Sequence, residues 1–381
     1  MRCIIHLETN LLRLRFSQHG SLYFSDDVSE ELRSRPLHQE GDTSAGDLGP
    51  QLELKYKIGP TVNREWWRGH YGRIDANRGP WPDMQTMIRS AADFQLRAID
   101  TGAVDVSSSR LKSTPADIPL LRRMLNMCIR IAPAIVPADP ALTAPALNHP
   151  DLSLTNLIVP NEGPAEIRHS IDWQGATVSP FCMQVHLPPA MAYTAGVIPL
   201  PPDGSEPSLP PDFDLRTPEE QEYLRRHHRS ARRQYWYSFI IQGIQRMRGE
   251  ALALPHYLQL ANLVPYITRC VAEGPADLRG LLIGLQQLWA EIAADGSSPC
   301  PVDFTPEELA AHTQEVQRQE EYERNVAQLY REIGCQNDGS VNPDEYEAAK
   351  ARVERLRHEW DEIAMKGPFP FFEGAYSYYL T

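Results

Sequence analysis

The strongest constraint on this chain of 381 residues comes from two short polar segments near its middle. Residues 149–156 read HPDLSLTN, and residues 171–173 read IDW. Between them lie two short apolar runs around a turn-like NEGP at 161–164, a pattern typical of an antiparallel β-hairpin. The first strand of a hairpin begins where the second one ends. Asn156 and Asp172 should therefore be neighbours at the open end of the hairpin.

These polar side chains have a defined chemical use. An amide oxygen and a carboxylate are hard donors that suit Mg²⁺, whose other ligands come from phosphates and water. A second carboxylate, Asp151, lies in the loop before the hairpin, where it can orient a hydroxyl group and accept its proton. We therefore assign Asp151 as the candidate catalytic residue, and Asn156 and Asp172 as candidate ligands of the metal and the cofactor. The simpler alternatives are a loop-capping Asp151, a turn amide at Asn156 and a helix cap at Asp172.

The neighbouring side chains are expected to be structural. His149 should orient the loop through a backbone hydrogen bond, and Ser153 and Thr155 should stabilise it. The arginine and tryptophan residues between positions 64 and 78 should stack in the core, which is favoured over a phosphate-facing role for one of the arginines.

The order H-x-D-x-x-x-x-N, followed by a hydrophobic-Asp-aromatic triplet, resembles the catalytic and metal-binding loops of the protein kinase-like superfamily. The IDW triplet is similar to that of the aminoglycoside phosphotransferase and choline kinase branch. Four further segments resemble the fungal group named altered inheritance of mitochondria protein 9: GSLYF at 20–24, IGP at 58–60, RGPW at 78–81 and SIDWQ at 170–174. The resemblance extends from about residue 16 to the end of the chain.

This resemblance implies an α+β protein of the protein kinase-like fold, mainly its helical C-terminal lobe with a small catalytic β-hairpin. It implies transfer of the ATP γ-phosphate to a small-molecule hydroxyl, with ATP and Mg²⁺ held at Asn156 and Asp172. It also implies a mitochondrial location; without it, the chain would be assigned to the cytoplasm.

One part of the kinase-like pattern is missing from this sequence. A kinase-like enzyme has a small β-rich lobe whose glycine-rich loop and strand lysine hold the ATP phosphates. Lys55, Lys57 and Lys112 are the lysines that precede Asp151, and no glycine-rich loop precedes any of them. The alternating sequence at 52–58 predicts an edge strand, in which Lys55 and Lys57 face solvent.

We therefore divide the chain into a hinge with a remnant of the N-terminal lobe, residues 1–62, and a helical phosphotransferase lobe, residues 63–381. Two explanations are open. The gene model is truncated at its 5′ end, or the protein is a catalytically inactive pseudoenzyme that acts as a binding or assembly module.

Composition limits the partners. The net charge of −13 argues against nucleic acid and against an anionic membrane surface. The six cysteines form no C-x-x-C pair and no glycosylation sequon occurs, which favours an intracellular setting. No apolar run is long enough to predict a membrane span. A protein partner could bind through the helical lobe.

Apolar spacing predicts helices over residues 84–101 and 118–135, with a loop around 107–109 between them. TPEE at 217–220 is a strong helix start, with a capping threonine, a proline at the first helical position and a glutamate that completes the capping box.

The same signal recurs near the C-terminus. TPEE at 305–308 should begin a helix that ends near Gly334, and NPDE at 342–345 should begin one that ends near Gly367. Their short connection predicts that they pack as an antiparallel pair. The aromatic tail at 368–379 should pack back on the body of the protein.

Overall fold

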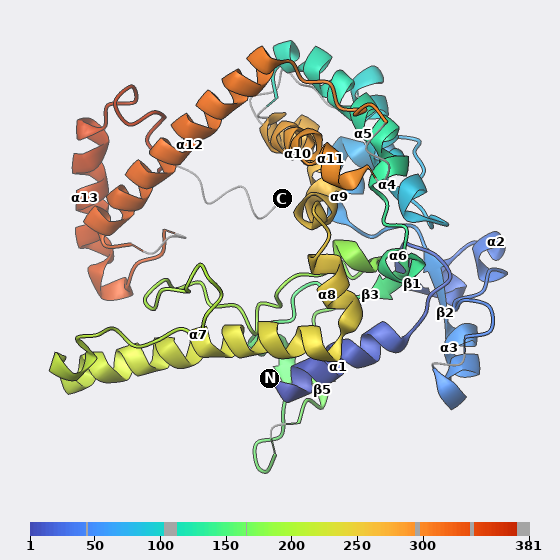
Figure 1. The fold of residues 1–381 in the computed structure, drawn as a ribbon, viewed down its shortest axis with the longest axis horizontal. Helices are drawn as coiled ribbons and strands as arrows, with labels where there is room; N and C mark the ends of the chain where they lie inside the picture. Colours follow the sequence, from blue (N-terminus) through green and yellow to red (C-terminus); the bar gives the residue numbers. More distant parts are fainter. Residues whose placement is uncertain (43–44, 103–112, 165, 294–297, 336–338, 372–381) are drawn as a thin grey trace. The chain divides into compact units, whose positions relative to one another are not determined.

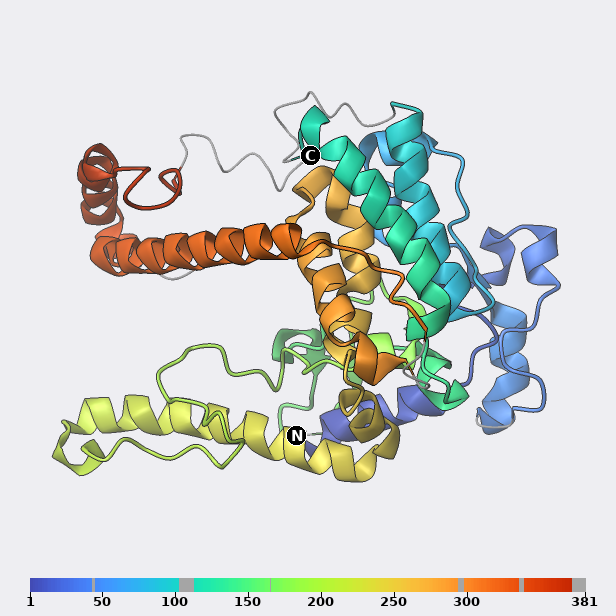
Figure 2. The same ribbon diagram turned by 45° about the horizontal axis from the view of Figure 1, so that its top comes forward.

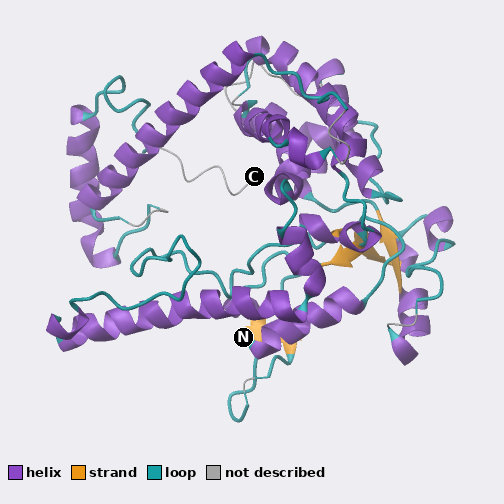
Figure 3. Ribbon diagram, viewed as in Figure 1, coloured by secondary structure: helices purple, strands orange, loops and turns teal. Residues whose placement is uncertain are grey.

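The computed structural model describes all residues of the chain except 43–44, 103–112, 165, 294–297, 336–338 and 372–381. It divides into two compact units, Met1–Val302 and Asp303–Thr381. Most of the described secondary structure is helical, and the strands form small antiparallel sheets (Figure 3). The mixed helix-and-sheet class is therefore confirmed. The predicted division at residue 62 falls inside the first unit and stays a prediction, and the loop predicted at 107–109 lies outside the described residues.

Helices form the body of the first unit. They are α1 (Arg2–Arg13), α4 (Met84–Asp100), α5 (Ile118–Ile135), α7 (Pro218–Ile244), the shorter α8 (Arg246–Leu252), α9 (Tyr257–Glu273) and α10 (Ala276–Gln287). Short helices between them are α2 (Glu30–Arg33), α3 (Gly49–Lys55), α6 (Pro140–Thr143) and α11 (Trp289–Ile292). In the described part of the chain, no helix combines the length and the apolar character that a bilayer crossing requires.

The core of this unit lies where α4 packs on α5 and α9, and α9 packs on α10. Figures 1 and 2 both show α4 running beside α5. Asp83 caps α4 by accepting a hydrogen bond from the Thr86 amide at 2.7 Å. Ile88 and Phe94 on its inner face have no exposed surface. The helices predicted at 84–101 and 118–135 are confirmed to within one residue, because their apolar spacing matches a buried helix face.

Three antiparallel strand pairs flank these helices: β1 (Ser21–Phe24) with β2 (Tyr56–Gly59), β3 (Pro145–Leu147) with β6 (Val178–Pro180), and β4 (Leu157–Ile158) with β5 (His169–Ser170). Gly20 links the first two pairs, since its backbone exchanges hydrogen bonds of 2.8 Å with Val178. A Cβ atom at Gly20 would lie 2.3 Å from the carbonyl oxygen of Gly59. The close approach of these backbones therefore requires glycine at this position.

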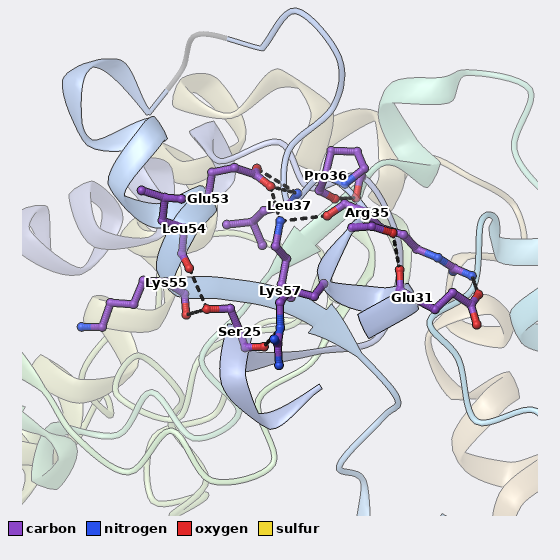
Figure 4. A network of polar contacts seen from close by, with 12 residues as sticks. Ser25, Glu31, Arg35, Pro36, Leu37, Glu53, Leu54, Lys55 and Lys57 are labelled. Atoms are coloured by element: carbon purple, nitrogen blue, oxygen red, sulfur yellow. Dashed lines mark hydrogen bonds and ion pairs between the residues drawn. The ribbon is translucent and has the colours of Figure 1, made fainter. Parts of the chain in front are cut away.

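The edge strand predicted at 52–58 is wrong in its first half, because α3 continues to Lys55 and β2 begins only at Tyr56. Lys55 is exposed as expected, but Lys57 is buried. The Lys57 ammonium group donates to the backbone oxygen of Arg35 at 2.9 Å and to the carboxylate of Glu53 (Figure 4). Glu53 also accepts from the Leu37 amide at 2.9 Å. Lys57 thus joins α3 and β2 to the preceding loop instead of facing solvent.

The helix starts predicted from TPEE are confirmed. Thr217 and Glu220 form a reciprocal capping box before α7, and Thr305 and Glu308 form one before α12 (Pro306–Ile333). The last turn of α12 is followed by Gly334 at φ 82°, a left-handed cap that glycine adopts readily.

The final helix of the second unit is shorter than predicted. Residues Pro343–Glu345 form a single 3-10 turn, and α13 (Tyr346–Glu359) ends well before Gly367. It ends there because Asp361 accepts hydrogen bonds from the next backbone amides and the Trp360 indole donates to the Gly367 oxygen at 2.9 Å. These contacts favour a turn over further helix.

The two helices of this unit pack against each other around a small apolar cluster. Leu329 and Ile333 of α12 meet Leu356 of α13 there, and Phe369 of the tail completes the cluster. The start of the aromatic tail therefore packs on its own unit as predicted, while its residues after Phe371 lie outside the described part.

Helices α1, α7 and α8 are joined by a buried ionic network. Arg248 donates to the Glu8 carboxylate at 3.0 Å, and the Tyr237 hydroxyl donates to the other Glu8 oxygen at 2.6 Å. Only 5 % of the Glu8 side chain and 8 % of the Arg248 side chain are exposed. Burial raises the pKa of Glu8, although Arg248 and Tyr237 act in the opposite direction. Loss of one member would leave a buried charge without its partner.

We expect Arg248→Met to lower the free energy of unfolding of the first unit by about 3–5 kcal/mol. Arg246→Met on the same helix is the matched control, because Arg246 pairs with Glu250 at the surface. It should change stability by less than about 0.5 kcal/mol. Urea unfolding followed by tryptophan fluorescence measures both. Equal effects of the two substitutions would contradict the structural role of the buried pair.

A second prediction concerns pH and Glu53. Desolvation raises the pKa of this carboxyl, but its hydrogen bonds with Lys57 and Leu37 outweigh that effect and hold the pKa below its usual 4.5. The native state therefore binds protons less readily than the unfolded state, so the stabilisation is present above pH 4.5 and is lost as pH falls through the lowered pKa.

The unfolding temperature of Glu53→Gln should accordingly lie below that of the wild type at neutral pH, and the two temperatures should converge in acid. Glu31→Gln is the control within the same network, because Glu31 pairs with Arg35 at the surface (Figure 4). That variant should match the wild type at both pH values. A gap for Glu53→Gln that persists in acid would refute the assigned ion pair.

Candidate functional site

The hairpin predicted from the two polar segments is present. Leu157 pairs with Ser170 and Ile158 with His169 in antiparallel register. The Ile171 amide then donates to the Asn156 carbonyl at 2.9 Å. Asn156 is thus hydrogen-bonded to the residue directly before Asp172, which places the two candidate ligands at the open end of the same hairpin.

Asn156 and Asp151 are in direct contact. A 3-10 turn at Leu154–Asn156 closes the loop, and the Asn156 side chain, 9 % exposed, folds back onto it. Its Nδ2 group donates to the Asp151 backbone oxygen at 2.9 Å and to the Asp151 Oδ2 atom at 3.1 Å. Because the Asn156 amide nitrogen donates to Asp151, the Oδ1 atom of Asn156 is the side-chain atom that could hold a cation.

Asp172 has an unusual backbone. Its φ is 64°, in the left-handed region that residues other than glycine seldom adopt, and its side chain is exposed. Such a conformation costs on the order of 1 kcal/mol and persists only where neighbouring contacts hold it. Those contacts lie on both sides of Asp172: the Ile171 oxygen accepts a hydrogen bond from His149 at 2.8 Å, and the Trp173 indole donates to the Ser170 oxygen at 3.1 Å.

His149 has the structural role expected from the sequence. Its ring is buried, its Nδ1 atom accepts from the Asp151 amide at 3.2 Å, and its Nε2–H therefore donates to Ile171. The imidazole also lies 4.5 Å from the Trp173 ring, centroid to centroid. One side chain thus fixes the loop that bears Asp151 to the strand that leads to Asp172.

The structural role predicted for Ser153 and Thr155 is confirmed, whereas the core stacking predicted for the segment from Arg64 to Arg78 is only partly so. The Ser153 and Thr155 hydroxyls bond to each other at 2.8 Å within the loop.

The Arg78 guanidinium stacks 4.3 Å from the Trp67 ring and donates to the backbone oxygens of Trp66 and Tyr71. Trp66 is buried in the core, but Arg64, Trp67 and Arg68 are exposed, so the prediction of core stacking is wrong for these three residues. Arg78 therefore stacks on an exposed ring at the edge of the core.

The loop itself rests on helices from both ends of the first unit. Leu152, 2 % exposed, packs in a cluster with Ile4 and Ile5 of α1 and with Tyr237 and Ile241 of α7. Sequence reasoning did not identify this support, because the apolar residues involved are more than 80 residues apart and carry no local signal of their contact.

A cleft of about 230 Å³ opens beside the loop. Asn148 and Pro150 of the loop form one wall, and Thr177 lies beyond the hairpin. Met87 of α4 and Val264 of α9 also line the cleft. Sequence reasoning missed this cleft as well, since its walls come from segments far apart in the chain.

The donor set fits a hard divalent cation. Within the described ranges there is no cluster of three or more histidine, cysteine, aspartate or glutamate side chains that could hold a metal. Mg²⁺ does not need such a cluster, because it takes one or two protein oxygens and completes its shell with phosphate and water. Asn156 and Asp172 would supply those protein oxygens.

Comparison with known proteins identifies fungal relatives. The chain is 26 % identical to a subtelomeric hrmA-associated cluster protein of Aspergillus fumigatus, over 96 % of this chain and 74 % of the relative. It is 25 % identical to altered inheritance of mitochondria protein 9 of Candida albicans and 24 % identical to that of Saccharomyces cerevisiae, over 82 % of this chain in both cases.

The chain spans about half the length of these two mitochondrial relatives, 51 % of each. No family model matches the sequence, and no solved structure matches it. The names of the Candida albicans and Saccharomyces cerevisiae relatives carry the word mitochondrial, which supports the mitochondrial location that the resemblance predicts. The chain is thus a relative of the fungal proteins named altered inheritance of mitochondria protein 9.

Proposed function

We propose that the first unit is the helical lobe of a kinase-like phosphotransferase that transfers the γ-phosphate of ATP to a hydroxyl group of a small molecule. The observation that carries the proposal is the contact of Asn156 with Asp151 at the end of the hairpin where Asp172 adopts its left-handed backbone. Phosphoryl transfer needs little covalent chemistry from the protein and depends on such positioning of oxygens.

Each residue then has a defined role. Asp151 would accept the hydrogen bond of the acceptor hydroxyl and take its proton as the new P–O bond forms and the bond from the γ-phosphorus to the bridging oxygen of ADP breaks. The Asn156 amide keeps the Asp151 carboxylate oriented through the 3.1 Å hydrogen bond. Asn156 Oδ1 and the Asp172 carboxylate would hold Mg²⁺, which would neutralise charge on the nucleotide phosphates.

One observation favours a second candidate, a non-catalytic binding or assembly module. Lys57 precedes the catalytic loop on a strand, but its ammonium group is buried and donates to Glu53 and to the backbone of Arg35. It therefore does not supply the phosphate-binding lysine that an active kinase-like site uses. Binding of nucleotide without turnover would favour this second candidate.

We expect Asp172→Asn to weaken Mg-ATP binding to the full chain by at least about tenfold, because it removes the charge that holds the cation. Asparagine tolerates the left-handed backbone, so the fold of the hairpin is retained. Isothermal titration measures the affinity. Glu162→Gln, in the hairpin turn, removes an equal charge at the closed end and should leave the affinity unchanged. Micromolar binding that survives Asp172→Asn would refute the metal assignment.

A further prediction separates catalysis from binding. Asp151→Asn should keep the Mg-ATP affinity within about twofold and slow phosphoryl transfer about 10²- to 10⁴-fold, because the acceptor hydroxyl loses its base. The assay follows radioactive γ-phosphate from ATP into the small molecules of a fungal mitochondrial extract. Equal transfer by the wild type and the variant would exclude Asp151 as the base. If the wild type binds nucleotide but transfers nothing, the non-catalytic module gains support.

A further inference from the structure

The cleft beside the catalytic loop points to a class of acceptor, an inference that rests on the proposed phosphotransfer. Its walls include Asn148 and Pro150, and Pro150 directly precedes Asp151 in the chain. At about 230 Å³ it is smaller than most sites for drug-sized ligands, and it suits a small molecule or one end of a larger one. An acceptor whose hydroxyl group lies at Pro150 would have that group next to the loop that bears Asp151.

The walls of this cleft are uncharged. Among the described residues that line it, none is an aspartate, glutamate, lysine or arginine. His186 is the ionisable side chain of the lining, and burial together with the nearby Arg248 lowers its pKa, so it is neutral at physiological pH. A cationic acceptor would lose its hydration in this cleft and gain no counter-charge from the residues that line it.

Aromatic rings can replace carboxylates as partners of a quaternary ammonium group, but only through an open ring face. Trp66 and Trp81 line the cleft and are 2 % and 3 % exposed. The Trp66 ring stacks on Phe94 with centroids 4.7 Å apart. Gly79 lies so close to the Trp81 ring that a Cβ atom there would approach it to 3.0 Å. These ring faces are covered by the protein, so the cleft provides no aromatic cage.

The lining does offer neutral hydrogen-bonding groups beside apolar ones. Ser179 donates to the Thr177 hydroxyl at 3.0 Å, and the Asn148 amide lies 3.4 Å from the His186 ring nitrogen. Met87 and the residues of α9 supply the apolar part. Neutral polar and apolar groups together match a molecule with hydroxyl groups on a short hydrocarbon frame.

We propose that the acceptor of this protein is an uncharged hydroxyl compound with a small apolar portion, bound in this cleft, and not an amine or quaternary ammonium compound. The test uses two probes of the same shape. Choline carries a quaternary nitrogen, and 3,3-dimethylbutan-1-ol carries a carbon atom in its place. Both have a primary hydroxyl group, so they differ in charge alone.

Binding of each probe to the full chain is measured by saturation-transfer NMR without nucleotide or metal. The wild type should bind the neutral alcohol at least about tenfold more tightly than choline, because the cation finds no partner in the cleft. Equal or tighter binding of choline would overturn the proposal. Absence of binding of the alcohol up to its solubility limit would also overturn it.

A charge placed in the cleft should shift this preference. Asn63 lines the cleft and its Oδ1 atom accepts from the Glu65 amide at 3.1 Å, so Asn63→Asp adds a charge while keeping that hydrogen bond. We expect it to move the preference toward choline by about fivefold or more. Asn77→Asp is the control, because Asn77 accepts from the Gly79 amide in the same way but does not line the cleft. Equal shifts in both variants would show a general effect of net charge and refute the cleft as the binding site.

These measurements stand apart from the test of phosphotransfer. If the neutral alcohol binds and no phosphate is transferred, the cleft is a binding site and the enzymatic proposal fails. If phosphate is transferred to a cationic amine, the enzymatic proposal holds and the inference about the acceptor fails.

Discussion

The buried ion pair between Glu8 and Arg248 supports the candidate site, although neither residue lies in it. This pair and the Tyr237 hydroxyl fix α1, α7 and α8 to one another. Two of these helices then provide the apolar surface on which Leu152 packs. Since Leu152 directly follows Asp151, the position of the candidate base depends on an interaction between residues that are 240 positions apart.

In the candidate site, hydrogen bonds hold the loop that bears Asp151, and the backbone of Asp172 is strained. His149 ties the loop to the hairpin through two hydrogen bonds, and Asn156 closes the loop onto Asp151. Asp172 keeps an unfavourable backbone conformation because the residues on either side of it are held. The Asp151 carboxylate is thus oriented before any ligand arrives, which reduces the entropy lost on binding. This preorganisation is the physical basis of the phosphotransfer that we propose.

Lys57 and the neutral groups of the cleft differ in whether they are available to a ligand. The ammonium group of Lys57 is held by Glu53, so it contributes to the fold of the N-terminal hairpin. The neutral amides and hydroxyls that line the cleft of about 230 Å³ are the groups that we propose contact the acceptor. Lys57 thus has a structural role, and the neutral groups of the cleft are those that we propose bind a ligand.

Local sequence determined the features that depend on residues close together. The helices starting at Met84, Pro218 and Pro306 follow from their caps and apolar spacing, and the hairpin that brings Asn156 beside Asp172 follows from two short strands around a turn. Tertiary structure alone decided the burial of Lys57, the left-handed backbone at Asp172, the support of Leu152 by α1 and α7, and the uncharged cleft. The reason is physical: capping and periodicity act over a few residues, whereas burial and pairing of charges depend on which distant segments meet.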